Sequence, residues 1–211
     1  MLRILTILLF ALFVNNAAAA PATVTGVVSD PSGAPLPNSS VEAVPIDNYG
    51  FVGNLTWTQT DDHGNFRLNL REGRYEIRGK KETDGYPDPN SLLSVDSKAS
   101  FPEVVVSKRD IEGVQVRLGL KGGVLEGTVR DRTSHDFVQK AKITIRDAKR
   151  PQAYIELFTD KTGRFRFTVP CKPLIVSAVA ERHQETHLDG GSEWIPSSGE
   201  HRTVIFELES K

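Results

Sequence analysis

An internal repeat constrains the fold of this chain more than any other feature of its sequence. The segment Val24–Asp30 recurs about 100 residues later as Leu125–Asp131, and both copies contain Gly-x-Val-x-Asp. A second block, Thr-Asp-x-x-Gly-x-Phe, begins at Thr60 and again at Thr159. Two motifs repeated in the same order at one spacing indicate two copies of one folding unit.

The repeat also sets the expected domain boundaries. We expect one domain at residues 22–120 and a second at residues 123–210, with a linker at residues 119–123 that contains three glycines. The length of 211 residues does not by itself distinguish one domain from two. Each half is long enough to bury a modest core.

Alternating apolar residues predict β-strands in both copies. Apolar side chains occur at every second position in Phe66, Leu68 and Leu70, and again in Phe165, Phe167 and Val169. This spacing puts one face of a strand in the core and the other in solvent. Further strands are predicted at residues 41–44, 55–60, 74–78, 114–118, 143–146, 155–159, 174–176 and 204–208. No segment of useful length has helical periodicity, so the predicted fold class is all-β, with sheets packed face to face.

Each copy resembles the carboxypeptidase regulatory-like domain. The residues that carry the resemblance are the two repeated blocks, the Pro- and Gly-rich segment 31–37, and Glu72-Gly73-Arg74-Tyr75, where the family usually has Pro-Gly-x-Tyr. The second copy departs from the pattern at residues 132–142 and 171–173. The resemblance implies a transthyretin-like or prealbumin-like sandwich, part of the carbohydrate-binding-like fold. We therefore expect two tandem seven-stranded antiparallel β-sandwiches.

The block Thr-Asp-x-x-Gly-x-Phe has the composition of a hairpin turn. An Asp side chain can accept hydrogen bonds from nearby backbone N–H groups, and Gly adopts a positive φ without steric cost. We expect these roles for Asp61 and Gly64 in the first copy and for Asp160 and Gly163 in the second.

The N-terminus predicts export. Residues 1–19 combine an early Arg3, an apolar run from Ile4 to Val14 and a stretch of small residues, which is typical of a cleaved signal peptide. A membrane anchor is the alternative, but the apolar run is short for a bilayer span. Cleavage would leave 25 basic and 27 acidic residues, which argues against a nucleic-acid partner. The expected product is soluble and either secreted or periplasmic. In a eukaryotic host, Asn38 and Asn54 would begin glycosylation sequons.

The sequence lacks the residue patterns of the enzymes that use similar folds. It has no Gly-x-Ser-x-Gly, no His-Glu-x-x-His and no Tyr-Arg-Gly-Ser ending at residues 206–211. Cys171 is the single cysteine, so no intrachain disulfide can form, and we expect it to be a small core residue. The interpretation is a non-catalytic protein without a cofactor.

A polar segment near the C-terminus offers a metal hypothesis. His183, Glu185 and His187 would project from one face if the segment is extended. The two histidines would then lie roughly 13 Å apart at 3.3 Å per residue, too far to share an ion unless the chain bends. The segment is therefore interpreted as a polar stretch that leaves the sandwich, and the less favoured alternative is the metal site of a hydrolase.

Aromatic residues support a binding function. Sugar rings stack on exposed aromatic faces, and Trp194, Trp57, Tyr49 and Tyr86 lie outside the clear core pattern. Trp57 stands between two threonines, so it is either a core anchor or an outward platform, and burial statistics favour the core. Trp194, in a Gly-rich segment, is the expected exposed ring. The favoured ligand is carbohydrate or another extracytoplasmic polymer, and the alternative is a protein-interaction scaffold without a small ligand.

Basic residues form a further pattern in the first copy. Arg67, Arg71, Arg74, Arg78 and Lys80 are all expected on solvent faces of strands. They form either a basic stripe that attracts acidic polysaccharide or an ordinary solvated face.

Overall fold

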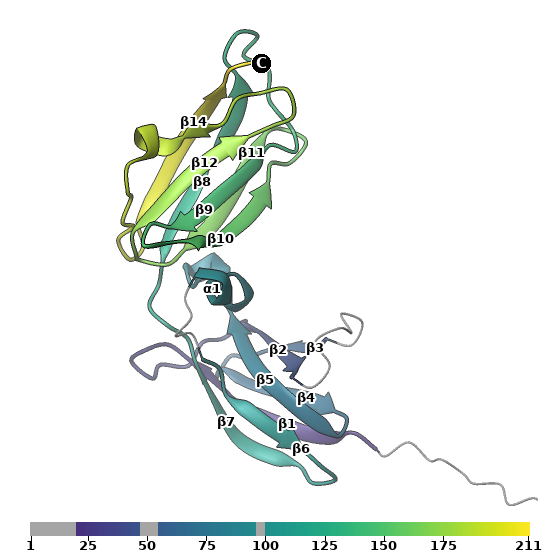
Figure 1. Cartoon of the computed structure of the whole chain (residues 1–211). Helices are drawn as coiled ribbons and strands as arrows, with labels where there is room; N and C mark the ends of the chain where they lie inside the picture. Colours follow the sequence, from purple (N-terminus) through teal and green to yellow (C-terminus); the bar gives the residue numbers. More distant parts are fainter. Residues whose placement is uncertain (1–19, 47–54, 96–99) are drawn as a thin grey trace, which may run out of the picture.

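Two β-sandwiches follow one another along the chain in the computed structural model (Figure 1). The structure describes residues 20–46, 55–95 and 100–211. The predicted signal peptide at residues 1–19 lies outside the described residues, as do Tyr49 and Asn54.

The first sandwich consists of a sheet with strand order β4-β1-β7 and a sheet with order β3-β2-β5-β6. Its strands are β1 (Ala22–Ser29), β2 (Ser40–Pro45), β3 (Thr56–Gln59), β4 (Asn65–Leu70), β5 (Gly73–Lys80), β6 (Glu103–Val106) and β7 (Ile111–Arg117).

The second sandwich repeats this topology, with sheets of order β11-β8-β14 and β10-β9-β12-β13. Its strands are β8 (Gly123–Asp131), β9 (Lys142–Asp147), β10 (Arg150–Phe158), β11 (Arg164–Val169), β12 (Leu174–Val179), β13 (Thr186–His187) and β14 (His201–Leu208). The all-β prediction of two seven-stranded sandwiches is confirmed. One pairing in each differs from the expected antiparallel pattern, because β7 runs parallel to β1 and β14 runs parallel to β8.

Each sandwich encloses its own hydrophobic core, and the alternating residues of the repeat supply much of it. Phe66, Leu68 and Leu70 are buried in the first core, as their spacing predicts. In the second core Phe165 and Val169 take the equivalent places. Burial of one face of each sheet is the main favourable contribution to this architecture.

The glycine of Gly-x-Val-x-Asp permits the parallel pairing. A Cβ atom on Gly26 would lie 2.0 Å from the carbonyl oxygen of Val114, on β7. The equivalent distance from Gly127 to the carbonyl oxygen of Val204, on β14, is 2.1 Å. No side chain fits at that separation, so the backbone of the last strand can come this close to the first only because Gly26 and Gly127 stand at these two positions.

The second repeated block forms the predicted turn in both copies. Asp61 Oδ1 accepts hydrogen bonds from the backbone N–H groups of residues 63 and 65, at 2.9 and 2.8 Å, and Gly64 has a φ of 76°. Asp160 accepts the equivalent bonds from residues 162 and 164, and Gly163 has a φ of 68°. The roles expected of these four residues are confirmed.

The connection between β5 and β6 contains structure that the sequence did not predict. It forms a short turn of 3-10 helix, η2 (Glu82–Asp84), and a short helix, α1 (Pro89–Val95). Helix α1 lies between the two sandwiches and contacts β10 of the second one (Figure 1). The N–H of Gly122 donates to the carbonyl oxygen of Gly85 at 2.8 Å. The β5–β6 connection therefore links the sheet β3-β2-β5-β6 to the linker at residues 119–123.

Candidate functional site

The outer face of sheet β3-β2-β5-β6 carries an exposed aromatic side chain beside fixed polar groups. Glu42 on β2 is paired with Trp57 on β3 and with Arg78 on β5, so the three form one row across the sheet. Trp57 is 67% exposed. The core interpretation of Trp57 is therefore wrong, because Thr56 and Thr58 take the inner side of this short strand.

Arg78 is held rigidly at the other end of this row. Its guanidinium donates to Glu76, with an Nε–Oε2 distance of 2.9 Å, and to the side-chain oxygen of Asn90. It also lies 5.3 Å from the centre of the Phe101 ring. Arg78 is only 5% exposed, whereas the alternation of β5 predicted a solvated side chain. The β5–β6 connection covers it, because Asn90 belongs to α1 and Phe101 follows that helix.

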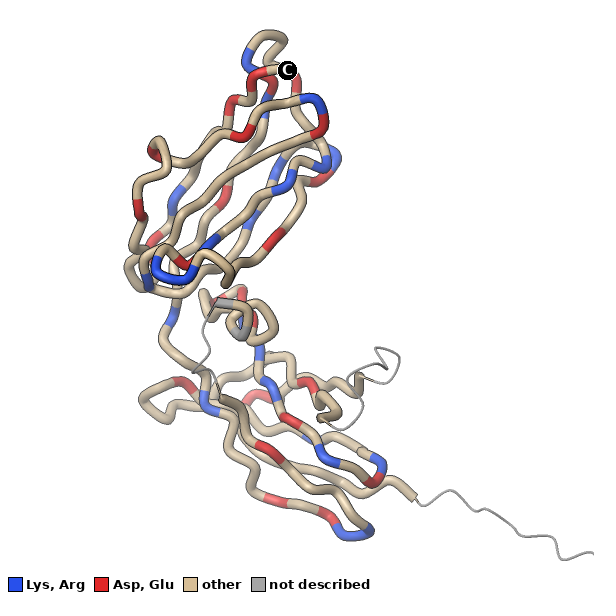
Figure 2. Tube along the Cα trace, viewed as in Figure 1, with Lys and Arg blue, Asp and Glu red and all other residues tan. Residues whose placement is uncertain are grey.

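The remaining cations of this face also have acidic partners. Lys80 pairs with Asp88 and lies 3.8 Å from Glu82. Burial lowers the pKa of Lys80, but the hydrogen bond and negative charge of Asp88 outweigh this and raise it above its ordinary value. Arg74 pairs with Glu103 at 3.2 Å. Basic and acidic positions are accordingly interspersed along this sheet (Figure 2).

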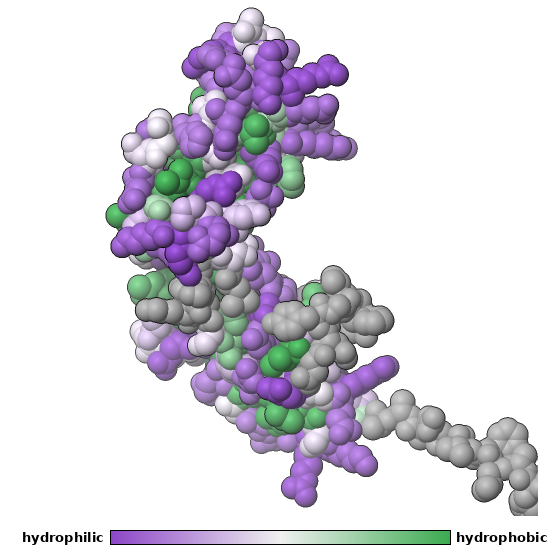
Figure 3. Space-filling view, viewed as in Figure 1, coloured by the Kyte–Doolittle hydropathy of each residue, from purple (hydrophilic) through white to green (hydrophobic). Residues whose placement is uncertain are grey.

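The predicted basic stripe does not exist as one surface. Arg67 lies on β4, which belongs to the opposite sheet from Arg74, Arg78 and Lys80 on β5. The three cations on β5 are paired with carboxylates. The visible surface of the molecule is mostly hydrophilic, with small apolar patches (Figure 3).

The other aromatic candidates are buried or lie outside the described residues. Trp194 is 7% exposed, so its predicted exposure is wrong. Its backbone pairs with Leu174, and its indole N–H donates to Glu200 Oε1 at 3.1 Å. Tyr86, expected among the exposed rings, is also buried in the core of the first sandwich. The structure does not test Tyr49, which lies in the undescribed segment 47–54.

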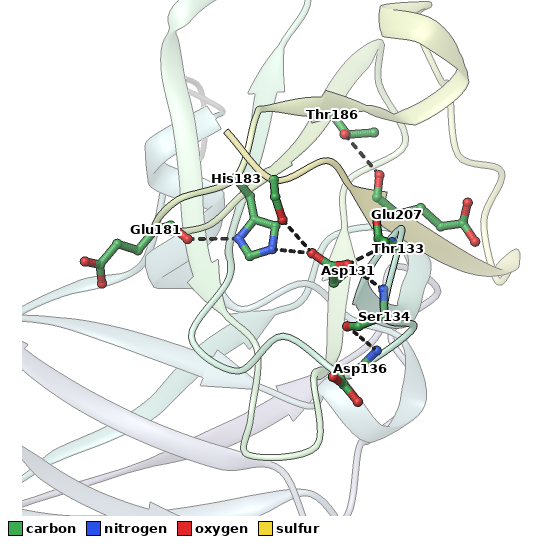
Figure 4. A network of polar contacts seen from close by, with 9 residues as sticks. Asp131, Thr133, Ser134, Asp136, Glu181, His183, Thr186 and Glu207 are labelled. Carbon is green, nitrogen blue, oxygen red and sulfur yellow. Dashed lines mark hydrogen bonds and ion pairs between the residues drawn. The ribbon is translucent and has the colours of Figure 1, made fainter.

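The three residues of the metal hypothesis do not converge. His183 Nε2 lies 3.1 Å from Asp131 Oδ2, and its Nδ1 lies 2.9 Å from the carbonyl oxygen of Glu181 (Figure 4). His187 and Glu185 instead face each other at 4.0 Å. Within residues 20–46, 55–95 and 100–211, no three His, Cys, Asp or Glu side chains are grouped to hold a metal ion.

The same network brings together a Ser, a His and an Asp that the sequence analysis did not connect. The Ser210 hydroxyl donates to Asp131 Oδ2 at 2.9 Å, the oxygen that His183 also contacts. A nucleophilic serine would instead be hydrogen-bonded to the histidine. The arrangement therefore ties the C-terminal residues to the end of β8 and is structural.

Asp131 gives this network a pH dependence. Hydrogen bonds from the Ser134 N–H, the Ser210 hydroxyl and the Thr133 N–H hold the pKa of its carboxyl well below the ordinary value. A carboxyl with a lowered pKa stabilises the fold above the unfolded-state pKa of about 4, and this contribution is lost as the pH falls through the folded-state pKa. We expect Asp131→Asn to lower the Tm near neutral pH, and the difference from wild type to shrink below about pH 4. Thermal unfolding of residues 20–211 checks this, and a difference that does not vary with pH would contradict the electrostatic explanation.

Two of the hollows in the described surface have neither Trp57 nor Glu42 in their lining. A groove of about 720 Å³ is lined by residues of β8, β10, β11 and β14, and a pocket of about 440 Å³ lies where the linker meets the β5–β6 connection. Cys171 lines the second pocket and is exposed, so the expectation that it is a core residue is wrong. Partial burial and the charge of Glu200 raise the pKa of its thiol, which disfavours the reactive thiolate.

In the part of the chain that the structure describes, the helices are all too short or too polar to cross a membrane.

The fold is that of an all-β protein of two sandwiches that share one strand topology. Residues 23–119, which span the first sandwich, match the family described as carboxypeptidase regulatory-like domain. A comparison with curated proteins found no match.

Several solved structures are similar to this chain. The Bacillus anthracis TIE protein is 15% identical, with a TM-score of 0.38, over 90% of this chain and 34% of its own. A streptococcal ancillary pilin is 14% identical, with a TM-score of 0.38, over 92% of this chain and 63% of its own. The shaft pilin spaA from Lactobacillus rhamnosus GG is 9% identical, with a TM-score of 0.34, over 90% of this chain and 98% of its own. This chain thus spans about a third of the first protein and less than two thirds of the second.

Proposed function

We propose that this protein is a non-catalytic binding module that attaches to carbohydrate or a related extracytoplasmic polymer. The binding surface is the outer face of sheet β3-β2-β5-β6. The observation that carries the proposal is the exposed indole of Trp57 in one row with Glu42 and Arg78. An exposed ring gives a sugar a stacking platform, and neighbouring polar side chains hydrogen-bond its hydroxyl groups.

The polar groups beside Trp57 are fixed before any ligand binds. Arg78 is bonded to Glu76 and Asn90, and Asn90 Nδ2 donates to Glu42 Oε2 at 3.4 Å. Groups that are already ordered lose little conformational entropy on binding, which favours affinity. Through Asn90, the network therefore orders Glu42 beside the exposed ring of Trp57, while Arg78 itself is buried.

We further propose that residues 1–19 are a cleaved signal peptide and that the mature chain, residues 20–211, is secreted or periplasmic. Residues 22–120 and 123–210 are proposed as two folding units, since each encloses its own core. The second unit holds its tryptophan in that core and acts as a spacer for the first. Nucleic acid is not the expected partner, because the charge of the mature chain is slightly negative.

Replacing Trp57 by alanine tests the proposed function. We expect affinity for β-linked hexasaccharides to fall by about 1–3 kcal/mol, the contribution of one aromatic stacking contact. The Tm should stay close to wild type, because the ring is exposed and contributes little to the core. Isothermal titration calorimetry and thermal unfolding of the mature chain measure the two quantities.

The matched control is Tyr154→Ala, which removes an exposed aromatic side chain from β10 of the second sandwich. This variant should bind as wild type does. Equal affinity of Trp57→Ala and wild type would place any sugar binding elsewhere.

A protein-interaction scaffold is the second candidate function. Strand β10 is a nine-residue edge strand, and Phe158 at its end is 62% exposed. An edge strand with unpaired backbone groups and exposed aromatic side chains can pair with a strand of another protein. This reading gains support if the mature chain binds no carbohydrate.

A further inference from the structure

The charges around Trp57 indicate which kind of sugar its face would accept. Each cation on the outer face of β5 already has an acidic partner: Arg74 has Glu103, Arg78 has Glu76, and Lys80 has Asp88. Lys80 also lies near Glu82, whose pKa is raised chiefly by burial. An acidic ligand would have to compete with these carboxylates for every cation.

Glu42 differs from the other carboxylates of this face. Among the described residues it forms no ion pair within 4.0 Å, although its charge adds a small part to the raised pKa of Lys80, and its one hydrogen bond is the 3.4 Å contact with Asn90. It is half-buried and lies directly across the strand pair from Trp57. Side chains paired in this way have Cβ atoms about 5 Å apart. A ligand group stacked on the indole would therefore lie within reach of a carboxylate with unused acceptor capacity.

An exposed indole beside such a carboxylate favours a positively charged group. An ammonium group is attracted by the face of the ring, and tryptophan gives the strongest attraction of this kind among the aromatic side chains. The same group can donate hydrogen bonds to Glu42, and hydrogen bonds between charged groups are roughly twice as strong as those between neutral ones.

We propose that the Trp57–Glu42 pair binds an amino sugar, so that the ligand is a carbohydrate polymer with free amines. The inference rests on the proposed function and narrows its ligand class. Glu42 accepts the hydrogen bonds of the ligand ammonium while Trp57 stacks on the sugar ring. Asn90 and Arg78 position Glu42 and make no ionic contact with the ligand.

Three hexasaccharides with the same β-1,4 backbone test the proposal: those of glucosamine, N-acetylglucosamine and glucose. Calorimetric titration of the mature chain should give an affinity about tenfold higher for the glucosamine hexamer at a pH where its amines are charged, the effect of one charge-assisted hydrogen bond. Added salt should reduce this preference. Glu42→Gln should abolish the preference, so that the variant binds the glucosamine hexamer no more tightly than it binds the two uncharged hexamers. Trp57→Ala should weaken binding of all three.

Glu103→Gln is the matched control, because it neutralises a carboxylate of the same face that is already paired with Arg74. It should retain the preference for glucosamine. Equal binding of the three hexamers by wild type, or a preference that survives Glu42→Gln, would overturn the amino-sugar inference and leave carbohydrate binding standing. Failure of wild type to bind any of the three would contradict both proposals and favour the protein-interaction scaffold.

Discussion

Alanine in place of Gly26 or Gly127 should lower the free energy of unfolding of its sandwich by about 3 kcal/mol or more, the upper range for inserting a methyl group into packed structure. The added Cβ would meet a backbone carbonyl oxygen at 2.0 Å in the first sandwich and at 2.1 Å in the second. A carbonyl in a β-ladder cannot move aside without breaking the pairing of the first and last strands. Denaturant unfolding of the mature chain with each variant measures the loss.

The matched control for these variants is Gly119→Ala. Gly119 has no atom within 4 Å of its Cβ position and no positive φ, so alanine there should be nearly neutral. If the Gly26→Ala variant were as stable as the Gly119→Ala variant, the result would contradict the close approach of β7 to Gly26 and therefore the parallel pairing of β1 with β7.

Trp194→Ala should destabilise the second sandwich by about 3–5 kcal/mol, the usual cost of removing a buried tryptophan side chain. The ring packs in the core of that sandwich, and its N–H is bonded to Glu200. Truncation would leave a cavity and remove one partner of that carboxylate. Differential scanning calorimetry of the mature chain should show a transition at lower temperature for this variant.

Trp57→Ala provides the comparison, since it removes the same side chain from an exposed position. An unchanged Tm for Trp194→Ala would contradict the burial of this side chain and would make it a candidate for ligand binding again.

The sequence predicts the fold because its signals are local and repeated. Alternation at Phe66, Leu68 and Leu70 identifies a strand and its buried face without knowledge of its neighbours. The parallel pairing is not predictable in this way. The glycine that permits it is visible in both copies, but the carbonyl that it accommodates lies on a strand about 80 to 90 residues away. Helix α1 has seven residues, too few to establish a helical period.

The candidate site is harder to predict, because it depends on contacts between distant segments. Trp57 stands between two threonines, and that alternation does not say which face of the sheet is the inner one. Trp194 lies in a Gly-rich segment that suggests an exposed loop, yet its backbone returns to pair with Leu174. Arg78 is buried by side chains from the connection that follows it, which strand periodicity does not include.

We propose that the exposed face around Trp57 binds carbohydrate, and the two tryptophans of the chain allow a direct test. Each indole N–H gives one signal in a nitrogen–hydrogen correlation NMR spectrum, and Trp57→Phe assigns them. On titration of the mature chain with the glucosamine hexamer, the signal of Trp57 should shift progressively to saturation while that of the buried Trp194 stays in place. A shift confined to Trp194, or no shift of either signal at saturating ligand, would contradict the account.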